Sequence, residues 1–128
     1  MRTRILVIED NPANLDLMIY LLDAFGYSAV SARDGQEGLR MATQQKPDLI
    51  LCDIHLPKMD GYEVVRRLKN DPEYRLIPTV AVTALAMVGD RDRVLRAGFD
   101  GYLAKPIDPE MLIQQIKRFV NSSPAPLA

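Results

Sequence analysis

Short apolar runs that alternate with amphipathic stretches constrain the fold of this chain more than any other sequence feature. The run 49–52 is apolar throughout and ends at Asp53, which is typical of a strand buried on both faces of a parallel sheet. Comparable runs predict four more strands, at 4–9, 27–32, 77–83 and 99–104. Such a regular spacing of short strands leaves room for one helix after each of them.

The predicted helices begin at recognisable capping residues. Asn11 followed by Pro12 is a helix start, because Asn caps orphan amide groups and Pro fits the first helical position. The other start signals are Asp34 with Glu37, Asp60 with Glu63, and Asp108-Pro109-Glu110. The expected ends are Gly26, the residue before Pro47, the segment near Asn70 and Pro72, and Gly98. A helix over 84–97 is also expected, although its apolar pattern is irregular and interrupted by a Gly-Asp pair.

Five strands that alternate with five helices predict an α/β fold with a parallel sheet. We expect the doubly wound, flavodoxin-like (βα)5 architecture with strand order 2-1-3-4-5. A length of 128 residues suits one domain, which we place at 1–120, followed by a frayed C-terminal tail at 121–128.

Charge and cysteine content exclude several classes of protein. Sixteen basic residues are offset by seventeen acidic ones without a block of one sign, so no nucleic-acid-binding surface is expected. Cys52 is the single cysteine and lies in the predicted buried strand, where it is expected to be a core residue. The first apolar run is too short for a signal peptide or a membrane span, so we expect a cytoplasmic protein without a membrane partner.

Carboxylates stand at the ends of two predicted strands. Glu9 and Asp10 end the first strand and Asp53 ends the third, and these two strands are neighbours in the expected order. Three clustered carboxylates repel one another unless a cation lies among them, and Mg²⁺ prefers such oxygen ligands. The sequence therefore predicts a magnesium site, in which Mn²⁺ can substitute, at the carboxyl edge of the sheet.

The fourth and fifth predicted strands add a hydroxyl and a cation at the same edge. Thr83 ends the fourth strand, and Lys105 follows the fifth with an ammonium suited to a phosphoryl group. An acid, a metal, a hydroxyl and an ammonium at one edge indicate phosphoryl chemistry on a carboxylate nucleophile, Asp53.

The chain from about 5 to 119 resembles a response-regulator receiver domain of two-component signalling. The residues that carry the resemblance are Glu9-Asp10, Asp53, Leu56-Pro57, Asp60-Gly61, the VTALA run with Thr83, and Lys105-Pro106. The resemblance implies that a histidine kinase or a histidine phosphotransfer protein phosphorylates Asp53. It also implies Mg²⁺ held by Glu9, Asp10, Asp53 and the backbone carbonyl of His55, with Thr83 and Lys105 holding the phosphoryl oxygens.

The same resemblance implies how the signal leaves the domain. Phosphorylation would draw Thr83 inward and let Tyr102 turn inward, so both are switch candidates. Helix 4, strand 5 and helix 5 would form the surface read by a downstream protein, and Pro106 is a candidate for a cis peptide bond. The chain would be a phosphoacceptor that assists its own phosphorylation and dephosphorylation rather than an enzyme, and a monomer or weak dimer. It resembles single-domain regulators of the DivK type and the receivers of hybrid histidine kinases.

Other interpretations of single residues remain open at this point. His55 is either a partly exposed loop residue or a ligand, and it could alter the lifetime of the phosphoryl group through water access. Tyr102 is either a switch or a plain half-buried strand residue, and the bond before Pro106 is either cis or trans.

Three other functions share some of these features. An aspartate-nucleophile phosphatase resembles D-x-D, but here the second position after Asp53 is His55. A flavin-binding protein of the same architecture needs a Ser/Thr/Gly-rich loop after its first strand, where this chain has Glu9-Asp10-Asn11-Pro12. An adaptor that binds partners without phosphorylation would not require the complete set of acidic, hydroxyl and ammonium groups.

Overall fold

Ten elements of secondary structure alternate along the described part of the chain. The computed structural model describes residues 2–84 and 89–120. The strands are β1 (Arg4–Ile8), β2 (Ser28–Ala32), β3 (Leu49–Asp53), β4 (Thr79–Thr83) and β5 (Gly101–Ala104). The helices are α1 (Pro12–Ala24), α2 (Gly35–Gln45), α3 (Gly61–Lys69), α4 (Asp90–Arg96) and α5 (Pro109–Val120). All five predicted strands and five predicted helices are therefore present.

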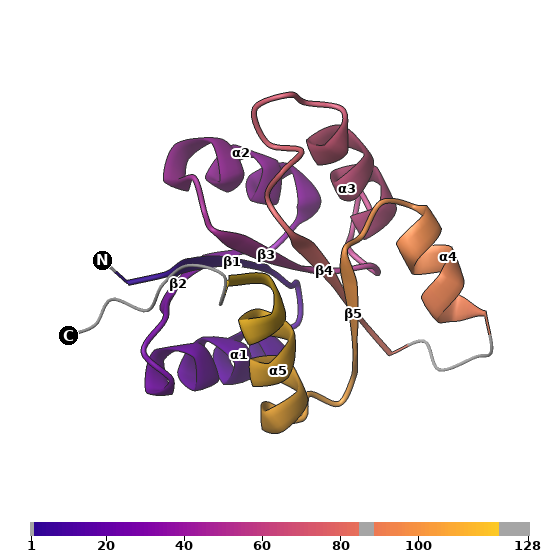
Figure 1. Ribbon diagram of the computed structural model, residues 1–128. Helices are drawn as coiled ribbons and strands as arrows, with labels where there is room; N and C mark the ends of the chain where they lie inside the picture. Colours follow the sequence, from indigo (N-terminus) through magenta and orange to yellow (C-terminus); the bar gives the residue numbers. More distant parts are fainter. Residues whose placement is uncertain (1, 85–88, 121–128) are drawn as a thin grey trace.

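The strands form one parallel sheet in the order β2-β1-β3-β4-β5 (Figure 1). The predicted flavodoxin-like fold and strand order are confirmed. The strand order changes direction between β1 and β3, so their carboxyl ends meet at the switch point of the sheet. A site in this fold is expected at that point.

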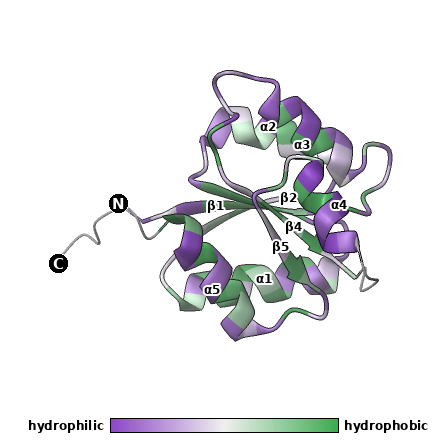
Figure 2. Ribbon diagram, turned by 45° about the vertical axis from the view of Figure 1, so that its right-hand side comes forward, coloured by the Kyte–Doolittle hydropathy of each residue, from purple (hydrophilic) through white to green (hydrophobic). Residues whose placement is uncertain are grey.

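Two hydrophobic cores fill the space between the sheet and its helices. Leu15, Met18 and Leu22 of α1 and Leu112 and Ile116 of α5 pack against one face of the sheet. The opposite face is covered by residues of α2, α3 and α4, namely Ala42, Val64, Val65, Leu68 and Val94. Strands β3 and β4 are buried at every position, as a continuous apolar run predicts, and Figure 2 shows the hydrophobic strands between the two helical layers. Among the described residues, no helix has the length and apolar character needed to cross a bilayer.

Side chains cap four of the described helices as the sequence predicts, and at α5 Asp108 accepts a hydrogen bond from the amide two residues later at 2.8 Å. Asn11 accepts a hydrogen bond from the backbone N–H of Asn14 at 3.0 Å. Asp34 and Asp60 do the same for the amides three residues later, at 2.8 and 2.9 Å. These bonds satisfy amide groups that have no partner inside the helix, which fixes where each helix begins.

The start of the fourth helix differs from the prediction. The expected helix over 84–97 is wrong at Ala84, which lies outside any helix, and residues 85–88 lie outside the described residues. Helix α4 begins only at Asp90, after Gly89, whose φ of 95° is incompatible with a right-handed helix. The predicted end at Gly98 agrees with the last helical residue, Arg96, and the cap at Ala97. The predicted tail at 121–128 also lies outside the described residues.

Several strands are one or two residues shorter than the sequence predicts. Strand β4 begins at Thr79 rather than at 77, because Pro78 has no N–H to donate and Ile77 bonds instead to Tyr74 within the preceding turn. Strand β5 begins at Gly101 rather than at 99, after Asp100 has accepted a hydrogen bond from the Thr79 amide. These two shifts leave the carboxyl ends of β4 and β5 unchanged, whereas β1 ends at 8 rather than at 9.

Candidate functional site

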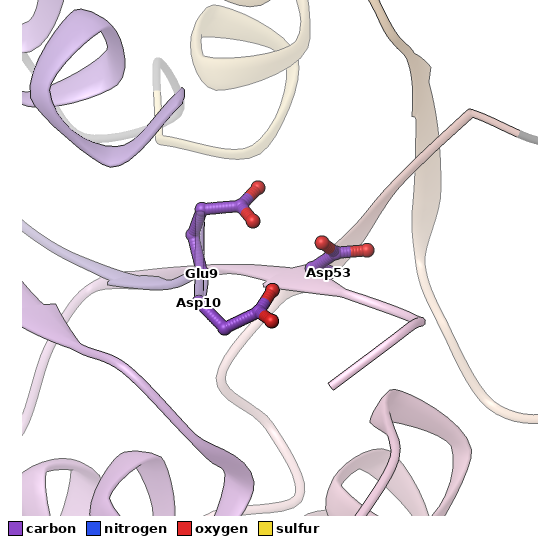
Figure 3. Close-up of side chains that lie close together, drawn as sticks. All are labelled: Glu9, Asp10 and Asp53. Carbon is purple, nitrogen blue, oxygen red and sulfur yellow. The ribbon is translucent and has the colours of Figure 1, made fainter. Parts of the chain in front are cut away.

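The register of the sheet brings carboxylates from β1 and β3 together. Ile8 pairs with Cys52, so the next residues, Glu9 and Asp53, leave the sheet side by side. Glu9, Asp10 and Asp53 each have one carboxylate oxygen that lies within 4.8 Å of the corresponding oxygens of the other two, and Figure 3 shows the three side chains close together. Glu9 and Asp53 are only 1% and 4% exposed, whereas Asp10 is exposed. The structure thus brings together the three acids that the sequence singled out.

Both carboxylate oxygens of Asp53 have defined partners. Oδ1 accepts a hydrogen bond from the backbone N–H of His55 at 3.0 Å. Oδ2 lies 2.8 Å from Nζ of Lys105, which also lies 2.9 Å from Oε1 of Glu9. These contacts fix the orientation of the Asp53 carboxylate at the carboxyl end of β3.

The environment of Glu9 disfavours its charged form. Burial raises the pKa of its carboxyl, and the neighbouring Asp53 raises it further, whereas Lys105 and the backbone N–H of Asn11 act in the opposite direction. For Lys105, burial lowers the pKa of the ammonium, but its bonds to Asp53 and Glu9 outweigh burial and the pKa is raised. Lys105 is therefore held as a cation between two buried acids.

Charge and geometry at this point suit a divalent cation. Three carboxyl groups cluster here and the single ammonium of Lys105 contacts two of them, so negative charge remains uncompensated among these four groups. Oε1 of Glu9 is buried, and its contact among the described residues is the ion pair with the Lys105 ammonium at 2.9 Å, which leaves it able to accept a further ligand. A hard cation with oxygen ligands would satisfy both the charge and this oxygen. The residues present fit Mg²⁺.

Gly61 supports the site in a way that the sequence did not reveal. A Cβ atom at this position would lie 2.4 Å from the backbone oxygen of Asp53 and 2.7 Å from Cα of Ile54. Its N–H donates to the carbonyl of Ile54 at 2.8 Å. The absence of a side chain lets α3 start directly against the strand that carries Asp53. The Asp60-Gly61 dipeptide was a visible signal, but only the fold shows this close approach.

Thr83 and Lys105 lie next to each other at the ends of β4 and β5. Thr83 is buried and pairs with Ala104, and its carbonyl accepts a hydrogen bond from the Lys105 amide at 2.9 Å. The peptide bond between Lys105 and Pro106 is cis. Both predicted phosphate-binding residues therefore stand at the same edge of the sheet as Asp53.

Tyr102, Cys52 and His55 occupy three different environments. Tyr102 is half-buried and packs on the face of the sheet that carries α2, α3 and α4. Ala81 pairs with Tyr102, and Thr83 lies two residues further along the same strand, so Thr83 and Tyr102 share a face of the sheet. Cys52 is buried, and burial raises the pKa of its thiol, which suits a core residue. The His55 side chain is exposed, so it is a loop residue here.

Comparison with known proteins places this arrangement in a family. Residues 5–117 match the model of the response regulator receiver domain. The chain is 42% identical over 119 residues to the polar-differentiation response regulator DivK of Brucella anthropi, covering 93% of this chain and 97% of that protein. It is also 42% identical over 123 residues to DivK of Brucella ovis, covering 96% of this chain and all of that protein.

Solved structures agree with these matches. One is the receiver domain of sensor histidine kinase PA1611 from Pseudomonas aeruginosa, described with a magnesium ion coordinated in its active site cleft. It is 36% identical, has a TM-score of 0.87, and covers 94% of this chain and 99% of that one. Vibrio cholerae chemotaxis protein CheY4 is 26% identical with a TM-score of 0.87, over 94% of this chain and all of that one. The chain belongs to the response regulator receiver domain family.

Proposed function

We propose that Asp53 is the phosphoacceptor of this receiver domain and takes its phosphoryl group from a histidine kinase or a histidine phosphotransfer protein. The observation that carries the proposal is the double anchoring of its carboxylate, by the His55 amide at 3.0 Å and the Lys105 ammonium at 2.8 Å. A nucleophile held in one orientation reaches in-line geometry without losing further side-chain freedom. One Asp53 oxygen attacks phosphorus, the P–O bond forms as the P–N bond of phosphohistidine breaks, and the imidazole leaves.

The surrounding residues would stabilise the transferred group. The ammonium of Lys105 lies close enough to Asp53 to contact a phosphoryl group attached there. The Thr83 hydroxyl is the second candidate for contact with a phosphoryl oxygen. A divalent cation held by Glu9, Asp10, Asp53 and the backbone carbonyl of His55 would neutralise charge on the phosphoryl oxygens.

The phosphorylated site would communicate with a protein-binding surface through Thr83 and Tyr102. These residues lie on one face of the sheet on neighbouring strands, so a displacement of Thr83 changes the space available to Tyr102. Tyr102 also lines a hollow of about 330 Å³ between α4, β5 and α5, together with exposed Leu95 and Met111. A downstream protein would bind there, and the chain would act as a phosphoacceptor switch rather than as an enzyme that releases a product.

Intact mass spectrometry tests the proposal directly. The native chain is incubated with acetyl phosphate or phosphoramidate, with and without Mg²⁺, beside Asp53→Asn. We expect one phosphate adduct that requires Mg²⁺ and is absent in Asp53→Asn, since an amide has the size of the carboxylate but not its nucleophilic oxygen.

Asp48→Asn is the matched control for this experiment. Asp48 precedes the same strand at its opposite end, where it accepts a hydrogen bond from the Arg4 amide at 2.8 Å. It should leave the adduct unchanged. An adduct that persists in Asp53→Asn would refute Asp53 as the acceptor. Folded protein without any adduct would instead support an adaptor that binds partners without phosphate.

A further inference from the structure

A second hollow of the molecule lies between α3 and α4, away from the acidic site. It has a volume of about 600 Å³ and is lined by Tyr62, Gly89, Asp90, Arg93, Arg96 and Ala97. None of these residues belongs to the Asp53 site or lines the hollow between α4, β5 and α5. We call it the α3/α4 groove, and Figures 1 and 2 both show the two helices that flank it.

Two uncompensated guanidinium groups line the α3/α4 groove. Arg93 and Arg96 stand one turn apart on α4, and neither forms an ion pair with a carboxylate of the described residues. The polar contact of Arg96 is a 3.4 Å bond to the carbonyl of Asp92 in its own helix. On α3, by contrast, both arginines of the last turn are paired with Glu63. Among the described residues that line the groove, Asp90 is the one with a carboxylate, so this part of the lining carries a net positive charge.

The floor of the groove contains a buried hydroxyl without a partner. The hydroxyl of Tyr62 makes no hydrogen bond with any described residue, although an unsatisfied buried polar group costs stability. Its ring packs edge-on against Phe99 with centroids 6.2 Å apart, and the guanidinium of Arg93 lies 5.4 Å from its centroid. The exposed Arg93 side chain can swing away from the ring, which would give an incoming oxygen atom access to the hydroxyl.

The shape and charge of the groove favour a side chain of another protein over a free small molecule. Small ligands are bound in sites that enclose most of their surface, whereas this groove is open to solvent. Two guanidinium groups provide parallel N–H donors for a planar carboxylate.

We propose that the α3/α4 groove binds a carboxylate side chain on an acidic segment of a partner protein. Arg93 and Arg96 donate to the two carboxylate oxygens, and the Tyr62 hydroxyl donates to one of them. The interaction uses residues outside the phosphorylation site, so it does not depend on the phosphoacceptor role of Asp53.

A phage-displayed library of random peptides, selected on the immobilised native chain, supplies the probe. The selected peptides are expected to contain Asp or Glu, and fluorescence anisotropy of a labelled one then gives its Kd. Arg96→Gln should raise the Kd at least about tenfold, because a hydrogen bond between charged groups is lost. Arg91→Gln is the matched control, since Arg91 lies on the same helix but lines the hollow on the α5 side. The Kd of the peptide for Arg91→Gln should equal its Kd for the native chain.

Tyr62→Phe separates binding from folding. Removing a buried hydroxyl that has no partner should leave the melting temperature equal or higher, yet it should weaken peptide binding severalfold. The proposal would be overturned if no peptide is enriched or if the enriched peptides lack acidic residues. It would also be overturned if Arg96→Gln binds the peptide as tightly as the native chain, or if Arg91→Gln weakens binding. Phosphorylation measured by intact mass is a separate readout, so failure here is distinguishable from failure of the phosphoacceptor role.

Discussion

Lys105 is an internal counter-ion of the acidic site as well as the proposed phosphate ligand. Its ammonium contacts Asp53 and Glu9, and the three side chains are 16%, 5% and 1% exposed. A carboxylate removed from water is costly unless a cation or hydrogen-bond donors compensate it. The stability of the site without metal therefore depends on this one side chain.

We expect Lys105→Met to lower the free energy of unfolding by about 3 kcal/mol in the presence of a chelator, because two buried carboxylates lose their counter-ion. Urea denaturation measures the change. Lys117→Met, at an exposed position of α5, should alter it by less than about 0.5 kcal/mol. Equal effects of the two substitutions would show that Lys105 does not compensate the buried acids.

At the scale of single elements, helix ends are set by backbone conformation as well as by side-chain caps. Helix α2 ends at Gln45 and is capped by Lys46, whose φ of 46° lies in the left-handed region that residues other than glycine rarely adopt. The N–H of Lys46 nevertheless donates to the Ala42 carbonyl at 3.1 Å. The helix is therefore capped by a residue whose backbone conformation is sterically strained.

Replacing Lys46 by glycine should raise the free energy of unfolding by about 0.5 to 1 kcal/mol, because glycine adopts this conformation without strain. The neighbouring substitution Gln45→Gly lies in the right-handed last turn of α2 and should have the opposite sign. Thermal denaturation of both variants measures these changes in stability. A loss of stability in Lys46→Gly would mean that the lysine side chain contributes more than its backbone costs.

Helix α3 provides a pH-dependent contribution to stability. Hydrogen bonds from Arg66 and Arg67 lower the pKa of the Glu63 carboxyl to about 2. A carboxyl whose pKa is lowered on folding stabilises the folded state above its ordinary value of 4.5, and this contribution is lost as the pH falls toward 2.

The stability difference between the native chain and Glu63→Gln is therefore expected to be constant above about pH 5 and to shrink toward about pH 2. Urea denaturation at a series of pH values measures it. Because Glu63 pairs with exposed arginines, added NaCl should reduce the difference at neutral pH. A stability difference that grows as the pH falls would contradict a lowered pKa of Glu63 in the folded state.

At the scale of the whole molecule, metal binding to the acidic cluster would be coupled to folding. Glu9, Asp10 and Asp53 come from two strands that meet only in the folded sheet. A ligand that binds the folded state alone stabilises it, by about 2.7 kcal/mol at one hundred times its Kd. Repulsion among the acids destabilises the same state when the ligand is absent.

We expect Mg²⁺ to raise the melting temperature of the native chain relative to NaCl of equal ionic strength. Asp10→Asn should reduce this shift because a ligand is lost, and should raise the melting temperature in chelator because repulsion is relieved. Differential scanning calorimetry measures both. A variant with an undiminished Mg²⁺ shift would place the ion elsewhere.

Much of the fold was predictable because its signals are local. Apolar runs predicted the strands, and Asn11, Asp34 and Asp60 predicted helix starts, since a capping side chain bonds to an amide three residues away. The start of α4 was wrong because its apolar pattern is irregular and a single glycine with positive φ determines the first helical residue. Lys46 carries no sequence signal for its left-handed backbone.

The sequence by itself determined the order of the elements, the family and the identity of the acids, hydroxyl and ammonium at the strand ends. Each of these follows from periodicity and local motifs, which the chain contains before it folds. Only the tertiary structure decided that Lys105 bridges two buried acids, that Gly61 must lack a side chain, and that the buried Tyr62 hydroxyl has no hydrogen-bond partner within residues 2–84 and 89–120. These features depend on distances between residues far apart in the chain, and such distances exist only after the sheet and its helices have packed together.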